Sequence, residues 1–472
     1  MNQRNKGNES RSYGKKAGFS KTEAKWKTDD PKKSAGQWKS DDKKRPVGQW
    51  KSDDRRKTTG TWHADDKRKT DENPRQAGRS VQTAKRQPKV PGAYQCPVAH
   101  KCGSCAYMGT LYSEQLKTKE KFVAEQLKPF GKCEPIVGMK DPRFYRNKVH
   151  AAFGWEKGTV ISGTYQESTH KVVSIETCLL ENQKADAIIG TIRKLLPSFK
   201  IKTYDENSEY GLFRRALVRV AQSTGEIMVV LVLTSPILPS KNNFVKALRK
   251  EHPEITTIIV NVNDKHTSMI LGDKEQVIYG KGYIVDELCG KTFKISAKSF
   301  YQINPVQTEV LYGLAMEYAG LTGKEKVLDA YCGIGTIGLV ASDKAAKVIG
   351  VELNRDAVRD AVVNAKLNQV KNIDFYEKDA GEFLLQMAAA SEKLDVIFMD
   401  PPRNGSDENF LSAAVTCAPE KIVYISCNVE TQARDLQYLT KHGYRFVKGR
   451  GVDMFPFTGH VECVVLMSRV EK

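Results

Sequence analysis

Hydrophobic runs of strand length alternate with helical patterns over residues 291–472. A helical pattern such as 355–368 separates runs that are rich in β-branched and other apolar residues: 327–331, 346–353, 373–377, 394–400, 421–426 and 463–467. Strands that alternate with helices in this way form a parallel sheet with helices on both faces. The pattern therefore predicts an α/β fold whose C-terminal part is a doubly wound, Rossmann-like parallel sheet.

The middle of the chain has a mixed pattern. Strand candidates lie at 216–221, 227–233 and 256–262, and the first two flank the turn 223–226, which predicts a hairpin. Residues 111–130 have the spacing of an amphipathic helix. We therefore expect a central α+β domain over 181–290. It would begin within a preceding segment, 91–180, that also holds a group of cysteines.

Residues 1–90 carry a twelve-residue repeat. Each repeat has one Trp, then an aspartate pair and a basic cluster; the Trp residues are Trp26, Trp38, Trp50 and Trp62. This segment has too few apolar residues to bury the surface that would offset its chain entropy. We therefore predict a disordered basic tail. An RNA-binding arm, with cations on phosphates and indoles stacked on bases, fits this composition. A solubilising spacer fits it as well.

Most of the positive charge of the chain lies in this tail. Residues 1–90 hold 26 Lys and Arg against 12 Asp and Glu, so they carry +14 of the total net charge of +19. A concentrated basic arm favours a polyanionic partner. No run approaches the ~18 apolar residues that span a bilayer, and the first residues do not resemble a signal peptide. We therefore expect a cytoplasmic, monomeric protein with no membrane partner, whose ten cysteines stay reduced.

Three cysteines occur within ten residues, with the spacing C-x5-C-x2-C: Cys96, Cys102 and Cys105. Closely spaced thiols separated by Gly and Pro are typical of a metal-binding loop. Such a loop needs a fourth ligand, and the candidates are Cys133, Cys178 and, less favourably, His100. Four thiolates bind either zinc or an iron–sulfur cluster, and the spacing alone does not choose between them.

Three of the predicted strands end in side chains that are typical of an enzyme site. The first runs into Gly333-Ile334-Gly335-Thr336-Ile337-Gly338, the second into Asp400-Pro401-Pro402-Arg403, and the third into Ser426-Cys427-Asn428. Ligands bind at the carboxyl ends of strands in open parallel sheets. The glycine pattern, with Glu352 ending the next strand, fits a dinucleotide or S-adenosylmethionine. The Asp-Pro-Pro loop favours S-adenosylmethionine beside a planar base.

These motifs together resemble the S-adenosylmethionine-dependent RNA uracil-5-methyltransferases, over about residues 94–472. The resemblance is closest to the iron–sulfur branch that acts on bacterial 23S rRNA, and it rests on further matches at 299–304 and at Thr458-Gly459-His460-Val461-Glu462. It implies a [4Fe–4S] cluster with Cys178 as the fourth ligand. It also implies that Gln302, Tyr331, Glu352 and Asp400 line the cofactor and base pocket. The chain has no run of strands before Cys96 like the TRAM barrel of many relatives, so the repeat tail would take over RNA capture.

The residues suggest how the methyl transfer would proceed. C5 of uracil is a poor nucleophile until a group adds to C6, and a thiolate both adds and leaves readily. Our hypothesis is that Cys427 attacks C6, C5 accepts the methyl group, and a base removes the C5 proton. The resemblance assigns that base to Glu462, while Asp400 would orient the base or support the enolate. The uridine must leave its stack to reach the cleft.

Other functions remain as alternatives. The same chemistry could act on tRNA, and cytosine-5 or amino-group methylation are further candidates. The Asp400 loop lacks the cysteine expected of a cytosine-5 enzyme, and Arg403 stands where an amino-group enzyme would place an aromatic residue. A third candidate is a non-catalytic RNA-binding protein with a redox cluster, which does not explain Cys427, Asp400 and Glu462.

Overall fold

The computed structural model describes residues 90–266 and 269–470. The chain divides into two units, Met1–Gln82 and Thr83–Lys472, and the account below concerns the second. The tail that carries the Trp repeats lies outside the described residues, so its disorder remains a prediction. Among the helices that the structure describes, none is both long and apolar enough to cross a membrane.

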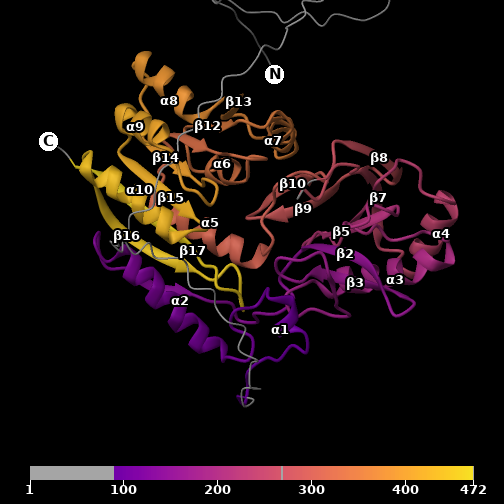
Figure 1. The fold of residues 1–472 in the computed structure, drawn as a ribbon. Helices are drawn as coiled ribbons and strands as arrows, with labels where there is room; N and C mark the ends of the chain where they lie inside the picture. Colours follow the sequence, from indigo (N-terminus) through magenta and orange to yellow (C-terminus); the bar gives the residue numbers. More distant parts are fainter. Residues whose placement is uncertain (1–89, 267–268, 471–472) are drawn as a thin grey trace, which may run out of the picture. The chain divides into compact units, whose positions relative to one another are not determined.

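The described part of the C-terminal region contains an eight-stranded sheet in the order β1-β16-β17-β15-β14-β11-β12-β13 (Figure 1). Its strands are β1 (Glu134–Val137), β11 (Lys326–Ala330), β12 (Lys347–Glu352), β13 (Ile373–Glu377), β14 (Val396–Met399), β15 (Lys421–Ser426), β16 (Tyr444–Val452) and β17 (Glu462–Arg469). The six predicted strands are all present, within a few residues of their expected bounds. The α/β fold is confirmed.

The prediction of a wholly parallel sheet is wrong, because β17 runs antiparallel to both of its neighbours, β15 and β16. A parallel connection needs a long crossover, usually a helix, whereas only residues 453–461 join β16 to β17. A buried strand is apolar on both faces in either direction, so the hydrophobic run of β17 carried no signal of its orientation. The sheet is therefore mixed, with a parallel centre.

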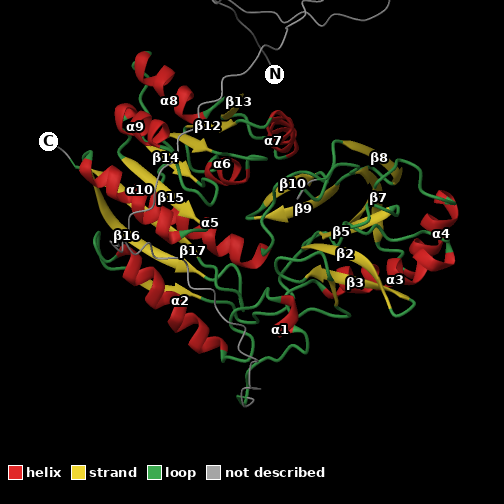
Figure 2. Cartoon of the chain, in the orientation of Figure 1, coloured by secondary structure: helices red, strands yellow, loops and turns green. Residues whose placement is uncertain are grey.

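Helices cover both faces of this sheet (Figure 2). One face packs against α2 (Tyr112–Leu127), α8 (Ala380–Ala389), α9 (Glu408–Cys417) and α10 (Val429–Lys441). The other face packs against α5 (Pro305–Ala319), α6 (Thr336–Ala341) and α7 (Arg355–Leu367). The doubly wound arrangement is confirmed.

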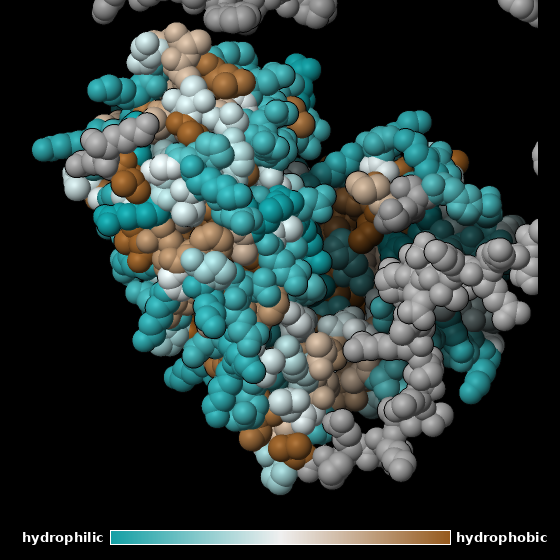
Figure 3. All heavy atoms as spheres, turned by 60° about the vertical axis from the view of Figure 1, so that its left-hand side comes forward, coloured by the Kyte–Doolittle hydropathy of each residue, from teal (hydrophilic) through white to brown (hydrophobic). Residues whose placement is uncertain are grey.

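On the face that Figure 3 turns forward, hydrophobic residues occur in small groups among predominantly hydrophilic ones.

A second, seven-stranded sheet occupies the middle of the described chain, in the order β4-β3-β2-β5-β6-β7-β8. Its strands are β2 (Lys148–Glu156), β3 (Thr159–Tyr165), β4 (Val172–Ser174), β5 (Phe213–Val220), β6 (Ile227–Leu233), β7 (Ile255–Val262) and β8 (Lys274–Tyr279). The predicted hairpin is β5 and β6, with Val220 paired to Ile227. The helices α3 (Gln183–Ser198) and α4 (Lys241–Glu251) bury one face of the sheet.

Three smaller elements complete the described fold. The hairpin of β9 (Ile284–Leu288) and β10 (Lys291–Ile295) shares a hydrophobic cluster with the other face of the seven-stranded sheet and with α5. The single-turn helix α1 (Ala99–Cys102) carries part of the cysteine motif. Segment 91–180 does not serve only the central domain, since α2 and β1 pack with the eight-stranded sheet.

Candidate active site

The parallel strands at the centre of the eight-stranded sheet bring their carboxyl ends to one edge. Met399 pairs with Ala330 on one side and with Tyr424 on the other, and Ala330 pairs with Val351. The residues that follow these positions include Tyr331, Glu352, Asp400 and Cys427. The strand ladder therefore gathers at one edge side chains that lie up to 96 positions apart in the sequence.

The antiparallel direction of β17 is what brings Glu462 to the same edge. Ser426 pairs with Cys463, so Glu462, the first residue of β17, begins where β15 ends. In a parallel arrangement, the start of β17 would lie at the opposite edge of the sheet, away from Cys427. The proximity of the Cys427 thiol to the Glu462 carboxyl group thus depends on the antiparallel direction of β17, which the sequence did not predict.

Burial and like charge dominate the electrostatics of this edge. Cys427 is half-buried, and its pKa rises to about 11 because burial disfavours the thiolate and because Glu462 and Asp400 add negative charge. Arg403 opposes that shift. Burial also raises the pKa of Asp400 to about 7. Burial and the nearby Asp400 together hold the pKa of Glu462 well above its usual range.

Glu462 also lacks a full set of hydrogen bonds. Its side chain is 3% exposed, and its Oε2 atom is buried without a partner in the structure. A buried carboxyl oxygen without a partner is costly to desolvate. A carboxyl group with a raised pKa becomes a stronger base once it is ionised. The geometry therefore suits proton transfer beside the thiol of Cys427.

The glycine loop lies between the ends of β11 and β12. The backbone N–H of Gly333 donates to Oε2 of Glu352 at 3.1 Å, and Oε1 accepts from the N–H of Asn354 at 2.7 Å. Gly335 has φ of +83°, and a Cβ there would lie 2.9 Å from the ring of Phe375. Only glycine fits this turn, which leads directly into α6. Gly335 thus allows this turn to pack closely against Phe375 of β13 and Ala361 of α7.

The side chain of Asp329 holds this loop, whereas the side chain of Tyr331 contacts residues outside it. Tyr331 has φ of +64°, its ring packs 5.1 Å from that of Phe410, and its hydroxyl lies 3.2 Å from Oγ of Ser406. Its side chain therefore packs toward α9. Oδ2 of the buried Asp329 accepts from the N–H of Gly338 at 2.7 Å, and burial raises its pKa to about 8.

Gln302 is held through its backbone by the central sheet. Nδ2 of Asn147 donates to the Gln302 carbonyl at 3.2 Å, and the N–H of Asn147 donates to the Ile303 carbonyl at 2.9 Å. The guanidinium of Arg219 donates to the carbonyls of Ala297 and Ser299, just before it. Gln302 itself is 8% exposed. Residues of β5 and of the chain entering β2 thus fix the segment that the family resemblance assigned to the cofactor pocket.

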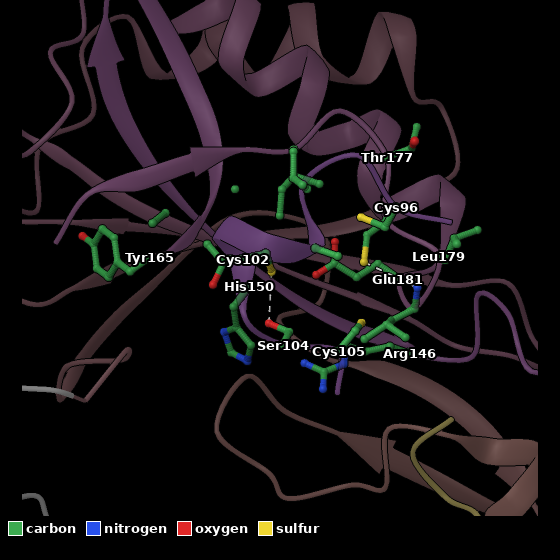
Figure 4. A pocket seen from close by; sticks show the side chains of 18 of the residues that line it. Cys96, Cys102, Ser104, Cys105, Arg146, His150, Tyr165, Thr177, Leu179 and Glu181 are labelled. Atoms are coloured by element: carbon green, nitrogen blue, oxygen red, sulfur yellow. Dashed lines mark hydrogen bonds between the residues drawn. The ribbon is translucent and has the colours of Figure 1, made fainter. Parts of the chain in front are cut away.

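The clustered cysteines surround a separate cavity of about 270 Å³ (Figure 4). Cys96, Cys102, Cys105 and Cys178 all line it, together with Arg146 and His150. Two of the alternative ligands do not line it: Cys133 packs against the eight-stranded sheet instead, and His100 lies outside the lining. Of the three candidates, the fold therefore brings only Cys178 to the other cysteines.

The side chains that line this cavity are not gathered around a single-ion site. In the described ranges, no group of three or more His, Cys, Asp or Glu side chains is gathered closely enough to hold one metal ion. A cubane cluster is larger and takes one thiolate at each iron. Nε of Arg146 and Nδ1 of His150 are buried on this cavity without hydrogen-bond partners. Such donors fit an anionic group with acceptor sulfurs.

Burial holds the thiols of Cys105 and Cys178 protonated in the absence of a ligand. Burial raises the pKa of Cys105 to about 12, with further contributions from Cys102 and Cys96. Burial, with Glu181 nearby, raises that of Cys178 to about 12 as well. Metal binding would have to release these protons, so occupancy of the cavity should depend on pH.

Comparison with known proteins identifies the class of enzyme. Residues 111–470 match the tRNA (uracil-5-)-methyltransferase family. The chain belongs to this family.

A Bacillus cereus protein named as an uncharacterized RNA methyltransferase is 41% identical over 383 residues, which cover 80% of this chain and 83% of that protein. A Halalkalibacterium halodurans protein of the same description is 41% identical over 377 residues, with 79% and 82% covered. The tRNA (uracil-54, C5)-methyltransferase of Pyrococcus abyssi, solved with S-adenosyl-L-homocysteine, is 28% identical. It has a TM-score of 0.66 and covers 77% of this chain and 85% of that one. The chain is thus an S-adenosylmethionine-dependent RNA uracil-5-methyltransferase.

In this uracil-5-methyltransferase, α2 holds the loop that leads to Glu462. Nζ of Lys119 lies 2.6 Å from Oδ1 of Asp453, and both side chains are almost completely buried. Lys119 also donates to the carbonyl of Phe455 at 3.0 Å, and Oε1 of Gln115 accepts from the N–H of Phe457 at 3.1 Å. The sequence analysis missed these residues. The available signal was that Gln115 and Lys119 lie two turns and one turn, respectively, before Val123 on its apolar stripe.

Proposed function

We propose that this enzyme methylates C5 of a uridine in RNA through a covalent bond between Cys427 and C6 of the base. The observation that carries this proposal is the convergence of Cys427, Asp400 and Glu462 at one sheet edge. S-adenosylmethionine supplies the electrophilic methyl group. Each step assigned to the chain itself follows from the surroundings of these three residues.

Cys427 acts first, as the nucleophile. Its thiol must lose a proton as the sulfur adds to C6, and its raised pKa means that this proton needs an acceptor. Asp400, whose pKa is about 7, is partly ionised near neutral pH and lies in electrostatic contact with the thiol. We propose that Asp400 assists this transfer and then orients the base. Arg403, which lowers the pKa of Cys427, favours the thiolate as it forms.

Glu462 acts last, as the general base. After C5 has accepted the methyl group, its remaining proton must leave before the C6–S bond can break. Glu462 lies beside Cys427 in a buried position that raises its basicity. The electrons of the C5–H bond then form the C5–C6 double bond, and the sulfur departs as the thiolate. Gln302, Glu352 and the backbone of Tyr331 would hold the cofactor.

We further propose that Cys96, Cys102, Cys105 and Cys178 bind a [4Fe–4S] cluster with a structural role. The cavity adjoins the loop that precedes Glu462: Thr458 lines it, and the hydroxyl of Tyr145 donates to the carbonyl of Pro456 at 3.2 Å. The backbone N–H of Tyr107 donates to the carbonyl of Phe457 at 3.0 Å. A bound cluster would order both sides of these contacts.

For the substrate, we propose a uridine in 23S rRNA, because the four cavity cysteines match the motif of the rRNA branch. The likeness to the Pyrococcus abyssi enzyme favours tRNA as the second candidate. The test is to incubate the purified enzyme with unmodified 23S rRNA, and separately with tRNA, and radiolabelled S-adenosylmethionine. Mass spectrometry then identifies the labelled nucleoside. 5-Methyluridine from rRNA supports the proposal, and label confined to tRNA changes the substrate but keeps the chemistry. Labelled cytidine would contradict it.

A further inference from the structure

The loop that connects β14 to α9, residues 400–407, carries two of the charged groups near Cys427. Asp400, at its start, raises the pKa of that thiol, whereas Arg403 lowers it. Residues 402–404 are exposed, so burial of their own side chains does not fix this part of the loop. Hydrogen bonds to the backbone of the loop hold it instead.

Side chains at the start of α10 bind this backbone. Nδ2 of Asn428, which precedes the helix, and the hydroxyl of Thr431 both donate to the carbonyl of Arg403, each at 3.2 Å. One turn later, Nη2 of Arg434 donates to two further carbonyls of the loop at 2.9 and 3.0 Å. Three carbonyl groups of the loop therefore accept hydrogen bonds from one helix end.

Asp435 joins the loop, the helix and the sheet. Its side chain is completely buried, and its Oδ2 accepts from the backbone N–H of Ser406 at 2.8 Å and from the hydroxyl of Tyr424 at 2.6 Å. Its Oδ1 accepts from Nε and Nη2 of Arg434 at 2.9 and 2.7 Å. Tyr424 belongs to β15, three residues before Cys427. Because hydrogen bonds to a carboxylate are short and strong, this one side chain fixes the loop relative to β15.

The contact between Asp435 and the loop leaves no space for a side chain at Gly405. Gly405 has φ of +74°, and its N–H donates to the carbonyl of Pro402 at 2.8 Å. A Cβ at this position would lie 2.6 Å from Nη2 of Arg434 and 2.6 Å from Oδ2 of Asp435. Glycine at position 405 therefore allows the loop to lie directly against α10.

We propose that Asp435 is a positioning residue that holds this loop against β15 and so keeps Arg403 near the Cys427 thiol. Asp435 itself contacts no reacting atom. Asp400 follows the end of β14 directly and stays with the sheet, whereas Arg403 lies three residues further and depends on the hydrogen bonds from α10. If the loop moved, the negative charges of Asp400 and Glu462 near the thiol would lose the cation that opposes them. The proposal rests on the proposed function only in taking Cys427 to be the nucleophile.

The first test measures the reactivity of Cys427 in the full-length enzyme, without RNA or S-adenosylmethionine. Timed alkylation at mildly alkaline pH, read by peptide mass spectrometry, follows this thiol separately from the other cysteines. The variant is Asp435→Asn, which keeps the shape of the side chain but turns an NH₂ group toward donors that the carboxylate accepted. We expect alkylation to slow by about 3- to 10-fold, because the thiolate loses the favourable charge of Arg403.

Glu430→Gln is the matched control for this test, since it removes an exposed carboxyl group from the same helix. It should leave the alkylation rate unchanged. A rate in Asp435→Asn that equals or exceeds the native rate overturns the proposal.

The second test asks whether the effect of Asp435 passes through Arg403. In the Arg403→Gln background the cation is already absent, so adding Asp435→Asn should change the alkylation rate by less than about twofold. A merely structural role of Asp435 would give the same fold loss in both backgrounds, and that result also overturns the proposal.

Gly405→Ala tests the same contact if Asp435→Asn does not fold. The added methyl group pushes the loop away from α10 while Asp435 keeps its carboxylate. We expect slower alkylation of Cys427 again, and a kcat for 5-methyluridine formation that is lower by about 10- to 100-fold. Gly443→Ala, with φ of +91° and no atom within 4 Å of the added Cβ, controls for backbone strain and should change neither.

The alkylation rates decide the role of Asp435 without any turnover. If Gly405→Ala folds and its Cys427 reacts at the native rate, the loop does not act on the thiol and the proposal is overturned. An enzyme that formed no 5-methyluridine would contradict the proposed function and would leave this comparison of rates valid.

Discussion

The sheet edge that carries Cys427 and the cysteine cavity that holds Cys105 and Cys178 both raise a thiol pKa through burial, but they are built in different ways. At the edge, Cys427 and Glu462 sit at the ends of paired strands, so backbone hydrogen bonds fix them without a ligand. In the cavity, three cysteines come from the loop around a four-residue helix and the fourth from the turn before α3. Two buried donors there lack partners. The edge is therefore preorganised, whereas the cavity depends on what it binds.

Removing the proposed nucleophile should produce the largest effect of any single substitution. We expect Cys427→Ala to lower the rate of 5-methyluridine formation by on the order of 10⁴-fold or more, since the proposed covalent step needs this thiol. The thermal midpoint should stay near the native value because the strand ladder does not need the thiol. Nucleoside mass spectrometry and thermal unfolding measure the two quantities. Methylation that survived in this variant would remove the covalent mechanism.

Removing the base should leave the first half of the reaction intact. We expect Glu462→Gln to lower kcat by about 10²- to 10⁴-fold, because loss of the C5 proton becomes slow after the methyl group has been transferred. Enzyme–RNA adducts that resist denaturation should accumulate on gels. Glu430→Gln, at an exposed position in the first turn of α10, is the control and should show neither change. A slow Glu462→Gln enzyme without adduct would place the carboxylate before methyl transfer.

Changes at the cavity should affect stability before chemistry. We expect Cys178→Ala to abolish the visible absorbance of the cluster and to lower the thermal midpoint by about 5 °C or more, because ligand binding contributes to folding at such sites. Cys133→Ala should keep the absorbance, since Cys133 does not line the cavity. A variant pattern with Cys133 essential and Cys178 dispensable would contradict the proposed ligand set.

The contact between α2 and the loop before Glu462 should make a smaller but measurable contribution to the free energy of unfolding. Lys119→Met leaves the buried carboxyl group of Asp453 without its cation, and we expect a loss of about 3–5 kcal/mol in the free energy of unfolding. The double variant with Asp453→Leu should recover part of that loss. Lys117→Met, on the exposed side of the same helix, should cost little. Urea denaturation measures all three.

The smallest expected effect is a shift in the pKa of Cys427. Its alkylation rate should rise with pH toward a midpoint near 11. Arg403→Gln should move the midpoint upward, because a cation that favours the thiolate is lost. Glu462→Gln should move it downward, because a negative neighbour is lost. Peptide mass spectrometry after timed alkylation follows Cys427 separately from the other cysteines.

The sequence predicted the long apolar strands of the eight-stranded sheet but missed the short and irregular ones. Strand ends carrying Asp400 and Cys427 were visible because buried strands leave continuous apolar runs. The strand β16 was not predicted because its charged and glycine residues, among them Gly449 and Gly451, interrupt its apolar positions. β1 is only four residues long and contains Pro135. The positions of such short and irregular strands are determined by the neighbouring strands with which they pair.

Tertiary placement accounts for the remaining differences. The direction of β17 follows from its connection to β16, which hydrophobicity does not encode. Lys119 looked like an ordinary helix lysine because its partner, Asp453, lies 334 positions away. The spacing of the first three cysteines predicted a ligand loop but left the fourth ligand open. The family resemblance pointed to Cys178, and the fold brings Cys178, but neither Cys133 nor His100, to the same cavity.

The central claim is that Cys427 forms a bond to C6 of the target uridine at a preorganised sheet edge. The most direct test uses RNA in which 5-fluorouridine replaces uridine, because fluorine at C5 cannot leave as a proton and the adduct is trapped. Native enzyme is incubated with this RNA and S-adenosylmethionine, digested, and mapped by mass spectrometry. We predict a peptide in which Cys427 carries a 5-fluoro-5-methyl nucleotide. An adduct on a different cysteine, or none despite normal methylation of unmodified RNA, would contradict the account.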